Sequence, residues 1–185
     1  VRLADVAAQP WRNGGGVTRE LLAWPRPDDW QLRVSVATIE RDGPFSPFPD
    51  VERWFAVIDG AGVELAWASG ASSLRLGDPP LHFVGEAAPD CRLLQGPTRD
   101  LNFMHRRGAG VGSMRPAHAG SRAEGSLRWR GLYVADAALV DLGERAEPLA
   151  AGTLLWAERR DLAAPARPWQ LQSAGRAWWL TLETR

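Results

Sequence analysis

Three histidines are the side chains of this sequence best suited to bind a metal ion, yet their spacing argues against a metal centre. His82, His105 and His118 are isolated from one another, and no His-x-His pair is present. An imidazole-rich metal site needs several such ligands to converge, whereas scattered histidines are more often surface groups or hydrogen-bonded core residues. The sequence therefore predicts no bound metal and no other cofactor.

Covalent catalysis also lacks its usual residues. Cys91, the single cysteine, precedes an apolar pair of leucines, so we expect a buried and unreactive thiol. No Gly-x-Ser-x-Gly turn is present to expose a serine nucleophile. General acid–base chemistry needs only a carboxylate or an imidazole in a dry pocket. Glu20 and His105 stay open as candidates for that role, although the sequence favours binding over catalysis.

A polar segment near the N-terminus surrounds three consecutive glycines, residues 14–16. The glycines could bring backbone N–H groups close to an anion, but a tight turn that needs positive φ angles is favoured. The polar candidates beside them are Arg12, Asn13, Thr18 and Glu20. Thr18 and Glu20 share one face of a regular strand. Glu20 could orient an arginine toward a pocket through a bidentate contact or form a purely structural salt bridge.

Two alternating segments carry a second group of polar candidates. Arg33 and Ser35 share one strand face, and Asn102, Met104 and Arg106 share a face of another strand. If both faces line a cavity, they supply guanidinium, amide, hydroxyl and thioether groups, which suit a small carboxylate or formyl group. If they face solvent, the arginines are ordinary surface charges, and periodicity alone favours this second arrangement.

Two aromatic residues lie in a proline-rich segment between these strands. Phe45 and Phe48 fall within residues 44–49, where Pro44, Pro47 and Pro49 stiffen the chain. Such a segment could form a semi-rigid lip over a pocket. For at least one phenylalanine, packing against a sheet as a loop anchor is the favoured interpretation.

The elements that must position these groups are short strands. Apolar residues alternate with period two far more often than with a helical period of 3.6. Strands are predicted at residues 30–36, 54–58, 63–67, 81–84, 92–94, 101–107, 127–134, 138–142, 153–157 and 178–182. Helices are expected only near residues 3–8 and directly after Asp50. Many short strands separated by Gly/Pro turns predict an all-β sandwich or barrel.

The chain divides into two halves around a segment of altered composition. Residues 109–125 are rich in Gly, Ala, Ser and Arg and are expected to form a flexible connection. Residues 1–108 form the predicted first half and residues 126–185 the second. Both halves show a strand pair, a Gly-containing turn and further strands, which suggests an internal duplication.

Composition excludes several classes of partner and location. The 22 acidic and 22 basic residues give no net charge, and every basic residue is arginine. A nucleic-acid binder needs a concentrated basic surface, and anionic membranes attract polybasic segments. No apolar run approaches the roughly 20 residues that span a bilayer. With one cysteine and no signal-peptide pattern, the predicted location is the cytoplasm.

Four segments together resemble the HutD/Ves family. They are residues 10–20 (PWRNGGGVTRE), 30–37 (WQLRVSVA), 42–49 (DGPFSPFP) and 96–104 (GPTRDLNFM). Their order along the first half makes the signal specific, whereas the second half is much less diagnostic. The resemblance implies an all-β double cupin (bicupin), with two β-sandwich or jelly-roll barrels packed as one compact unit. Because Arg33, Ser35, Asn102 and Met104 lie in these segments, it also favours the arrangement in which their strand faces line a cavity.

The resemblance further implies a function in binding rather than catalysis. HutD-like proteins are thought to sense or modulate bacterial histidine utilisation, with N-formylglutamate or urocanate as suggested ligands, and Ves-type members are connected with stress response. We therefore expect a metal-independent cupin that binds a small carboxylate, and a homodimer is a reasonable expectation for cupin-type sheets. Two alternatives stay open: a metal-free isomerase or hydrolase using Glu20 or His105, and a stress-response module that binds a protein partner.

Overall fold

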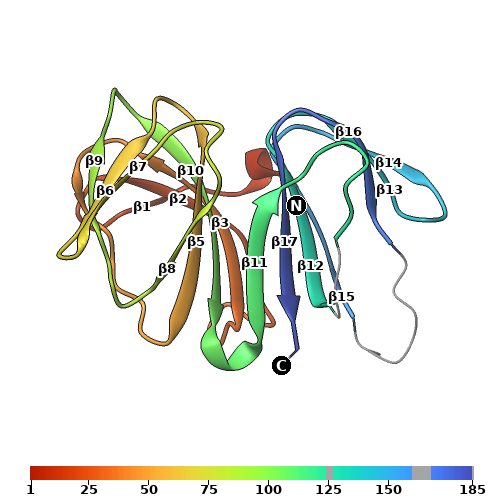
Figure 1. Ribbon diagram of the computed structural model, residues 1–185, viewed down its shortest axis with the longest axis horizontal. Helices are drawn as coiled ribbons and strands as arrows, with labels where there is room; N and C mark the ends of the chain where they lie inside the picture. The colour runs from red at the N-terminus through yellow and green to blue at the C-terminus, as the bar shows by residue number, and fades with distance from the viewer. Residues whose placement is uncertain (124–126, 160–167, 185) are drawn as a thin grey trace. The chain divides into compact units, whose positions relative to one another are not determined.

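The computed structural model describes residues 1–123, 127–159 and 168–184 and contains strands with two short 3-10 helices, η1 (Leu3–Asp5) and η2 (Arg107–Ala109). In Figure 1 the colour follows the chain from red at the N-terminus to blue at the C-terminus. Contacts along the chain define two compact units. One comprises Val6–Arg107, and the other comprises Val1–Asp5 together with Gly108–Arg185. We call them the first and the second unit. Within the described residues, no helix is long and apolar enough to cross a membrane.

The first unit contains two antiparallel sheets. The larger has the order β1 (Gln9–Pro10), β2 (Gly16–Trp24), β3 (Leu32–Ile39), β10 (Thr98–Arg106), β5 (Val51–Asp59) and β8 (Leu81–Val84). The smaller has the order β4 (Gly43–Pro44), β9 (Asp90–Leu93), β6 (Val63–Trp67) and β7 (Gly70–Leu74). Consecutive side chains of a strand point to opposite faces, so every second residue of β3, β5 and β10 shares the face that bears the candidate site.

Apolar residues from both sheets fill one part of the first unit's interior. The buried members of this cluster are Ile39, Phe55, Val57, Val63, Leu65, Leu74 and Cys91. Burial, followed by the nearby charges of Asp100 and Asp42, raises the pKa of Cys91 to about 12. The thiol is therefore buried and protonated, as the apolar context of Cys91 predicts.

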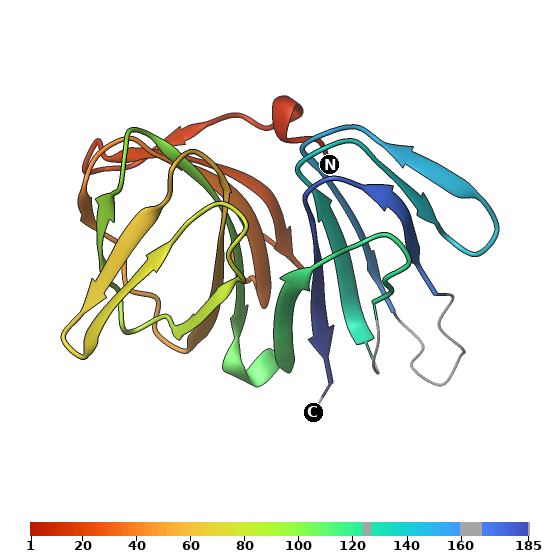
Figure 2. The same ribbon diagram turned by 45° about the horizontal axis from the view of Figure 1, so that its top comes forward.

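The second unit also contains two antiparallel sheets, seen from a second direction in Figure 2. One has the order β11 (Val111–Pro116), β17 (Ala177–Glu183), β12 (Leu127–Val134) and β15 (Thr153–Glu158). The other has the order β14 (Ala146–Leu149), β13 (Ala138–Asp141) and β16 (Gln170–Ala174). The N-terminus belongs to this unit because the Val1 amino group donates to the Leu154 carbonyl at 2.9 Å and Leu3 N donates to Gly152 O at 2.8 Å.

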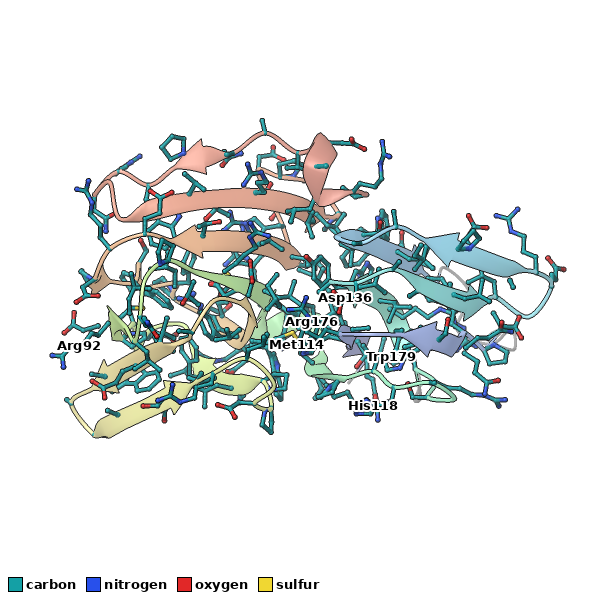
Figure 3. The ribbon with its side chains drawn as sticks, turned by 90° about the horizontal axis from the view of Figure 1, so that it is seen from above. Arg92, Met114, His118, Asp136, Arg176 and Trp179 are labelled. Carbon is teal, nitrogen blue, oxygen red and sulfur yellow. The ribbon has the colours of Figure 1, made fainter. Side chains whose placement is uncertain are left out.

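The described interior of the second unit is densely apolar. Its buried cluster comprises Ala117, Leu132, Val134, Ala138, Val140, Leu149, Trp169, Leu171, Ala177 and Trp179. The Trp179 Nε1 donates to Ser121 Oγ at 2.9 Å, so even the polar atom of the indole is paired. Figure 3 shows Trp179 on β17.

Two local features differ from the predictions made from sequence. Residues after Asp50 begin β5 rather than a helix, and Asp50 itself has a φ of 61° that places it in a turn before the strand. The expected helix at residues 3–8 is only the short η1.

The segment predicted to be a flexible connection, residues 109–125, contains β11, which pairs with β17. Only Met114 of β11 is buried, so the strand depends on backbone pairing and gives little apolar alternation to recognise. Residues 124–126, 160–167 and 185 of the predicted connection and second half lie outside the described residues. The predicted division at residue 108 stays a prediction.

Candidate ligand-binding site

A cavity of about 850 Å³ lies in the first unit. Its walls come from β2, β3, β5 and β10 and from the segments at residues 9–13 and 44–48. The lining residues are Gln9, Pro10, Trp11, Arg12, Asn13, Thr18, Arg33, Ser35, Ala37, Pro44, Phe45, Ser46, Pro47, Phe48, Arg53, Asp100, Asn102 and Met104. The volume lies in the range that proteins use to hold small molecules.

The strand register explains why these polar groups meet. Met104 of β10 lies between Arg33 of β3 and Arg53 of β5, and in the next row Asn102 lies opposite Ser35. Because side chains alternate along each strand, positions two residues apart share the cavity face. The polar side chains are therefore placed on one wall by backbone pairing.

Arg53 is the most deeply placed cation of the site. Its side chain is 5% exposed, and its guanidinium carbon lies 5.0–5.4 Å from the ring centroids of Phe45, Phe48 and Phe83. Burial is the largest cause that lowers the pKa of Arg53, to about 10, so the group keeps its charge at neutral pH. Its Nε has no hydrogen-bond partner among the described residues. Three aromatic faces thus hold a cation whose hydrogen-bonding capacity is only partly used.

Asn102 connects Arg53 to a buried acid. The Arg53 Nη2 donates to Asn102 Oδ1 at 3.1 Å, and Asn102 Nδ2 donates to both Asp100 carboxyl oxygens at 3.2 Å. Asp100 is 1% exposed. Burial raises its pKa to about 8, and this effect outweighs the opposing effects of Arg53 and Asn102. At neutral pH the wall therefore carries a charged guanidinium beside a largely neutral carboxyl group.

Arg33 supplies a second guanidinium to the cavity, and Glu20 orients it. The Arg33 Nε donates to Glu20 Oε2 at 2.5 Å across β2 and β3. Glu20 lies opposite Ser35 in the strand register but does not line the cavity. The geometry is a single contact rather than the bidentate one that Glu20 could have made, and it leaves the two Nη atoms of Arg33 free of that carboxylate.

The N-terminal glycines shape the rim of the site. Gly14 has a φ of +69°, and a Cβ on Gly16 would lie 2.2 Å from the Thr38 carbonyl oxygen. Both facts indicate a tight turn against β3, the favoured interpretation of the triplet. The turn is secured by Gly15 N donating to Asn13 Oδ1 at 3.0 Å and by Trp11 Nε1 donating to Thr18 Oγ1 at 2.7 Å.

The structure brings most of the predicted site residues to this one cavity. Those that line it are Arg12, Asn13, Thr18, Arg33, Ser35, Phe45, Phe48, Asn102 and Met104. Glu20 lies behind Arg33, and Arg106 lies elsewhere. The Arg106 Nε donates to the Trp30 carbonyl at 3.1 Å, and its guanidinium lies over the Trp30 ring. Arg106 ends β10 in an exposed position, so the strand face does not carry it into the cavity.

Arg53 and Asp100 are the principal site residues that the sequence prediction missed. Asp100 lies two residues before Asn102, and extension of the same strand face by one step would have included it. Arg53 shares the alternating face of Phe55 and Val57, and a cation in phase with inward apolar residues was the available signal. Three phenylalanine rings could be assigned to its neighbourhood only from the tertiary structure.

The donor set of the cavity does not fit a metal ion. Among its lining residues there is no histidine, and the described residues contain no group of three His, Cys, Asp or Glu side chains able to hold one. His82 contacts Glu52 at 2.7 Å, and His105 Nδ1 lies 3.1 Å from the Arg106 carbonyl oxygen. His105 is on the β10 face opposite Asn102. Guanidinium groups repel a divalent cation, so this wall suits an anion instead.

Comparisons with known proteins extend over the whole chain. Residues 3–179 match the family model described as HutD. The crystal structure of HutD from Pseudomonas fluorescens SBW25, in a formate condition, has a TM-score of 0.86 with this chain at 26% identity. That likeness covers 100% of this chain and 97% of the other. The expected all-β double-cupin fold is thereby confirmed.

Curated relatives match mainly through part of their length. An uncharacterized 21.2 kDa protein in the hutC 3′ region of Pseudomonas putida is 35% identical over 107 residues, covering 57% of this chain and 56% of the relative. Protein Ves from Citrobacter koseri is 35% identical over 108 residues, covering 56% of each. The chain thus spans a little over half the length of these curated relatives.

Proposed function

The chain belongs to the HutD family of cupin proteins, and on that premise we propose that it is a metal-independent receptor for a small carboxylate, acting as a sensor or modulator linked to histidine utilisation. The observation that carries the proposal is the meeting of Arg33, Arg53 and Asn102 on the wall of one cavity. Guanidinium groups recognise carboxylates through charge and paired hydrogen bonds. We place this activity in the cytoplasm, a reducing compartment in which a single buried cysteine stays a free thiol.

The shape of the site supports a ligand with an anionic end and an apolar body. Arg53 and Arg33 provide cations, whereas Phe45, Phe48 and Met104 provide adaptable apolar contact. N-formylglutamate carries two carboxylates and a planar formamide, and urocanate carries one carboxylate and a planar imidazole, so both offer groups that the two guanidinium groups can bind. The link to histidine utilisation draws support from the P. putida relative, whose name places it in the hutC 3′ region.

The arrangement favours binding over the catalytic alternative. Glu20 accepts a hydrogen bond from Arg33 and is set back from the cavity, so it makes a poor general base. His105 does not line the cavity, and Ser35 therefore has no imidazole beside it there to act as a base. Neither Glu20 nor His105 is therefore placed to be the proton-transferring group that a metal-free isomerase or hydrolase needs within reach of its ligand.

A thermal-shift screen tests the proposal. N-formylglutamate, urocanate, glutamate and formate are each added to the purified protein and to Arg33→Ala and Asn102→Ala variants. A ligand at 100 times its Kd adds about 2.7 kcal/mol to the free energy of unfolding. We expect a compound-specific increase in Tm that either substitution abolishes. Arg106→Ala is the matched control, because that arginine lies outside the cavity, and it should leave the shift intact.

Two results would redirect the assignment. No shift with any of the four compounds would contradict the histidine-pathway assignment and direct attention to a protein partner, the stress-response alternative. Turnover of N-formylglutamate by the purified protein, lost in Glu20→Gln, would instead establish an enzyme.

A further inference from the structure

One acidic group on the cavity wall is unexpected in a site for anions. Asp100 is 1% exposed and shares the cavity face of β10 with Asn102 and Met104. Among the described residues, its carboxyl group accepts hydrogen bonds from the Asn102 amide alone. A buried carboxylate with so few donors is poorly compensated for the loss of water. If it were ionised, it would also repel a bound anion.

Charged and titratable groups surround Asp100 from several elements, and among the described residues none of them forms a direct ion pair with its carboxyl group. Arg53 of β5 is linked to it by hydrogen bonds through Asn102, and the charge of Arg53 opposes the rise of the Asp100 pKa. Arg33 of β3 is paired with Glu20 of β2, and the Cys91 thiol of β9 is close enough for the charge of Asp100 to affect it. Arg12, in the segment after β1, is an exposed cation at the cavity.

We propose that Asp100 enters the ligand complex as a carboxylic acid that donates its O–H to the bound anion, which makes it a specificity-determining residue. The proton comes from solvent and stays on a carboxyl oxygen of Asp100, and no covalent bond forms or breaks. A protonated carboxyl group has one donor, whereas a carboxylate ligand only accepts hydrogen bonds, so the two are complementary. This inference rests on the proposed function, because it needs an anion beside Arg53 and Arg33.

The proposal has a defined pH dependence. In the ligand-free protein, burial raises the pKa of Asp100 to about 8, and an added anion raises it further. Below pH 8 the acid is already protonated, so the affinity for a monoanion is constant. Above pH 8 each binding event must also take up a proton, and the Kd rises up to about tenfold per pH unit.

The experiment combines calorimetry with NMR, using formate and N-formylglutamate as probes. Binding is measured at pH 6, 7, 8 and 9 in two buffers of different ionisation enthalpy, which reports proton uptake. We expect the Kd at pH 9 to be about tenfold higher than at pH 7. Asp100→Asn keeps an N–H donor in place of the acid, so it should bind at pH 7 within about threefold of the unaltered protein and lose the pH dependence. The control, Asp59→Asn, alters an exposed acid outside the cavity lining and should keep it.

A carboxyl ¹³C titration of the unaltered chain, with Asp100→Asn used only for assignment, follows Asp100 directly. A midpoint near 8 that moves upward on addition of formate supports the proposal. Anion binding of equal affinity at pH 7 and 9, or an Asp100 midpoint near 4 with the ligand bound, overturns it while the proposed function stands. Absence of binding by both anions at every pH overturns the proposed function. The titration of Asp100 in the ligand-free protein then shows separately whether its pKa is raised to about 8.

Discussion

The interiors of the two units differ in chemical character, because the first unit has a polar-walled cavity beside its apolar cluster. In the first unit, β3, β5 and β10 direct Arg33, Arg53, Asp100 and Asn102 to the wall of a cavity. In the second unit, the described interior is occupied by Leu132, Val140, Leu171 and the indoles of Trp169 and Trp179. Both are built from antiparallel sheets with the same kind of side-chain alternation. The difference lies in which side chains the alternation directs inward.

The two kinds of interior contribute differently to the free energy of folding. Closely packed apolar side chains contribute most of the free energy that favours folding. A cavity with buried polar groups forgoes part of that contribution and adds desolvation costs. We therefore expect the free energy of unfolding of the first unit to depend more strongly on pH between 4 and 8 than that of the second.

The largest expected effect at a fixed pH concerns the apolar interior of the second unit. Trp179 is 1% exposed, and Trp179→Ala should lower the free energy of unfolding by about 3–5 kcal/mol because it leaves a large void. Urea denaturation followed by circular dichroism measures the change. Val111→Ala, on the neighbouring strand β11 with Val111 57% exposed, is the control and should stay within about 0.5 kcal/mol. A loss below about 1 kcal/mol for Trp179→Ala would remove the contrast between the interiors.

The next effect is the response of the first unit to pH. The pKa of Asp100 is raised from 3.8 to about 8 in the folded protein, so the folded state binds the proton more tightly than the unfolded state. Its contribution to stability is therefore fully present below pH 4 and is lost as the pH rises to 8, with a slope of up to about 1.4 kcal/mol per pH unit. Urea unfolding of the unaltered protein and of Asp100→Asn between pH 4 and 8 should show a stability difference with this slope. A constant difference across the range would mean that Asp100 is ionised throughout.

A smaller effect is expected from the amide of Asn102, which lies between the two buried ionisable groups Arg53 and Asp100. Asn102→Ala removes the acceptor of Arg53 Nη2 and the donor to Asp100, and unpaired buried polar groups cost about 1–3 kcal/mol. The same urea titration at pH 7 gives this number, and the thermal-shift screen gives the loss of ligand binding. A variant as stable as the unaltered protein that also binds every compound as before would show that Asn102 is dispensable to the site.

The smallest effect belongs to an ion pair of the second unit. Asp136 accepts hydrogen bonds from the Arg176 side chain at 2.8 and 2.9 Å (Figure 3), and these contacts lower the pKa of Asp136 to about 2. The pair is about 40% exposed, so Asp136→Asn should cost at most about 1 kcal/mol. Its contribution is present above pH 4 and lost as the pH falls to 2, the opposite sign to Asp100. Urea unfolding at pH 2, 3, 4 and 7 distinguishes the two, and a difference that persists unchanged at pH 2 would contradict this assignment.

Local patterns account well for the strands that carry the site and poorly for the N-terminal part of the second unit. Period-two alternation predicted strands at residues 30–36 and 101–107, which fall largely within β3 and β10. The same rule could not find β11, where Gly112 and Ser113 pair through the backbone with β17 and bury little. A strand whose stability depends on a distant partner leaves only a weak trace in its own residues.

By itself, the sequence determined the all-β class, the family and the strand faces that bear Arg33, Ser35, Asn102 and Met104, because each of these depends on local alternation or on contiguous motifs. Only the tertiary structure decided that Arg53 joins them, that Arg106 does not, and that Asp100 is buried with the Asn102 amide as its hydrogen-bond donor. Those facts depend on strand order and on burial, which bring together residues such as Arg53 and Asn102 that are 49 positions apart along the chain. Burial then sets the charge of the acid, since a carboxyl group removed from water binds its proton more tightly than the same group in the unfolded chain.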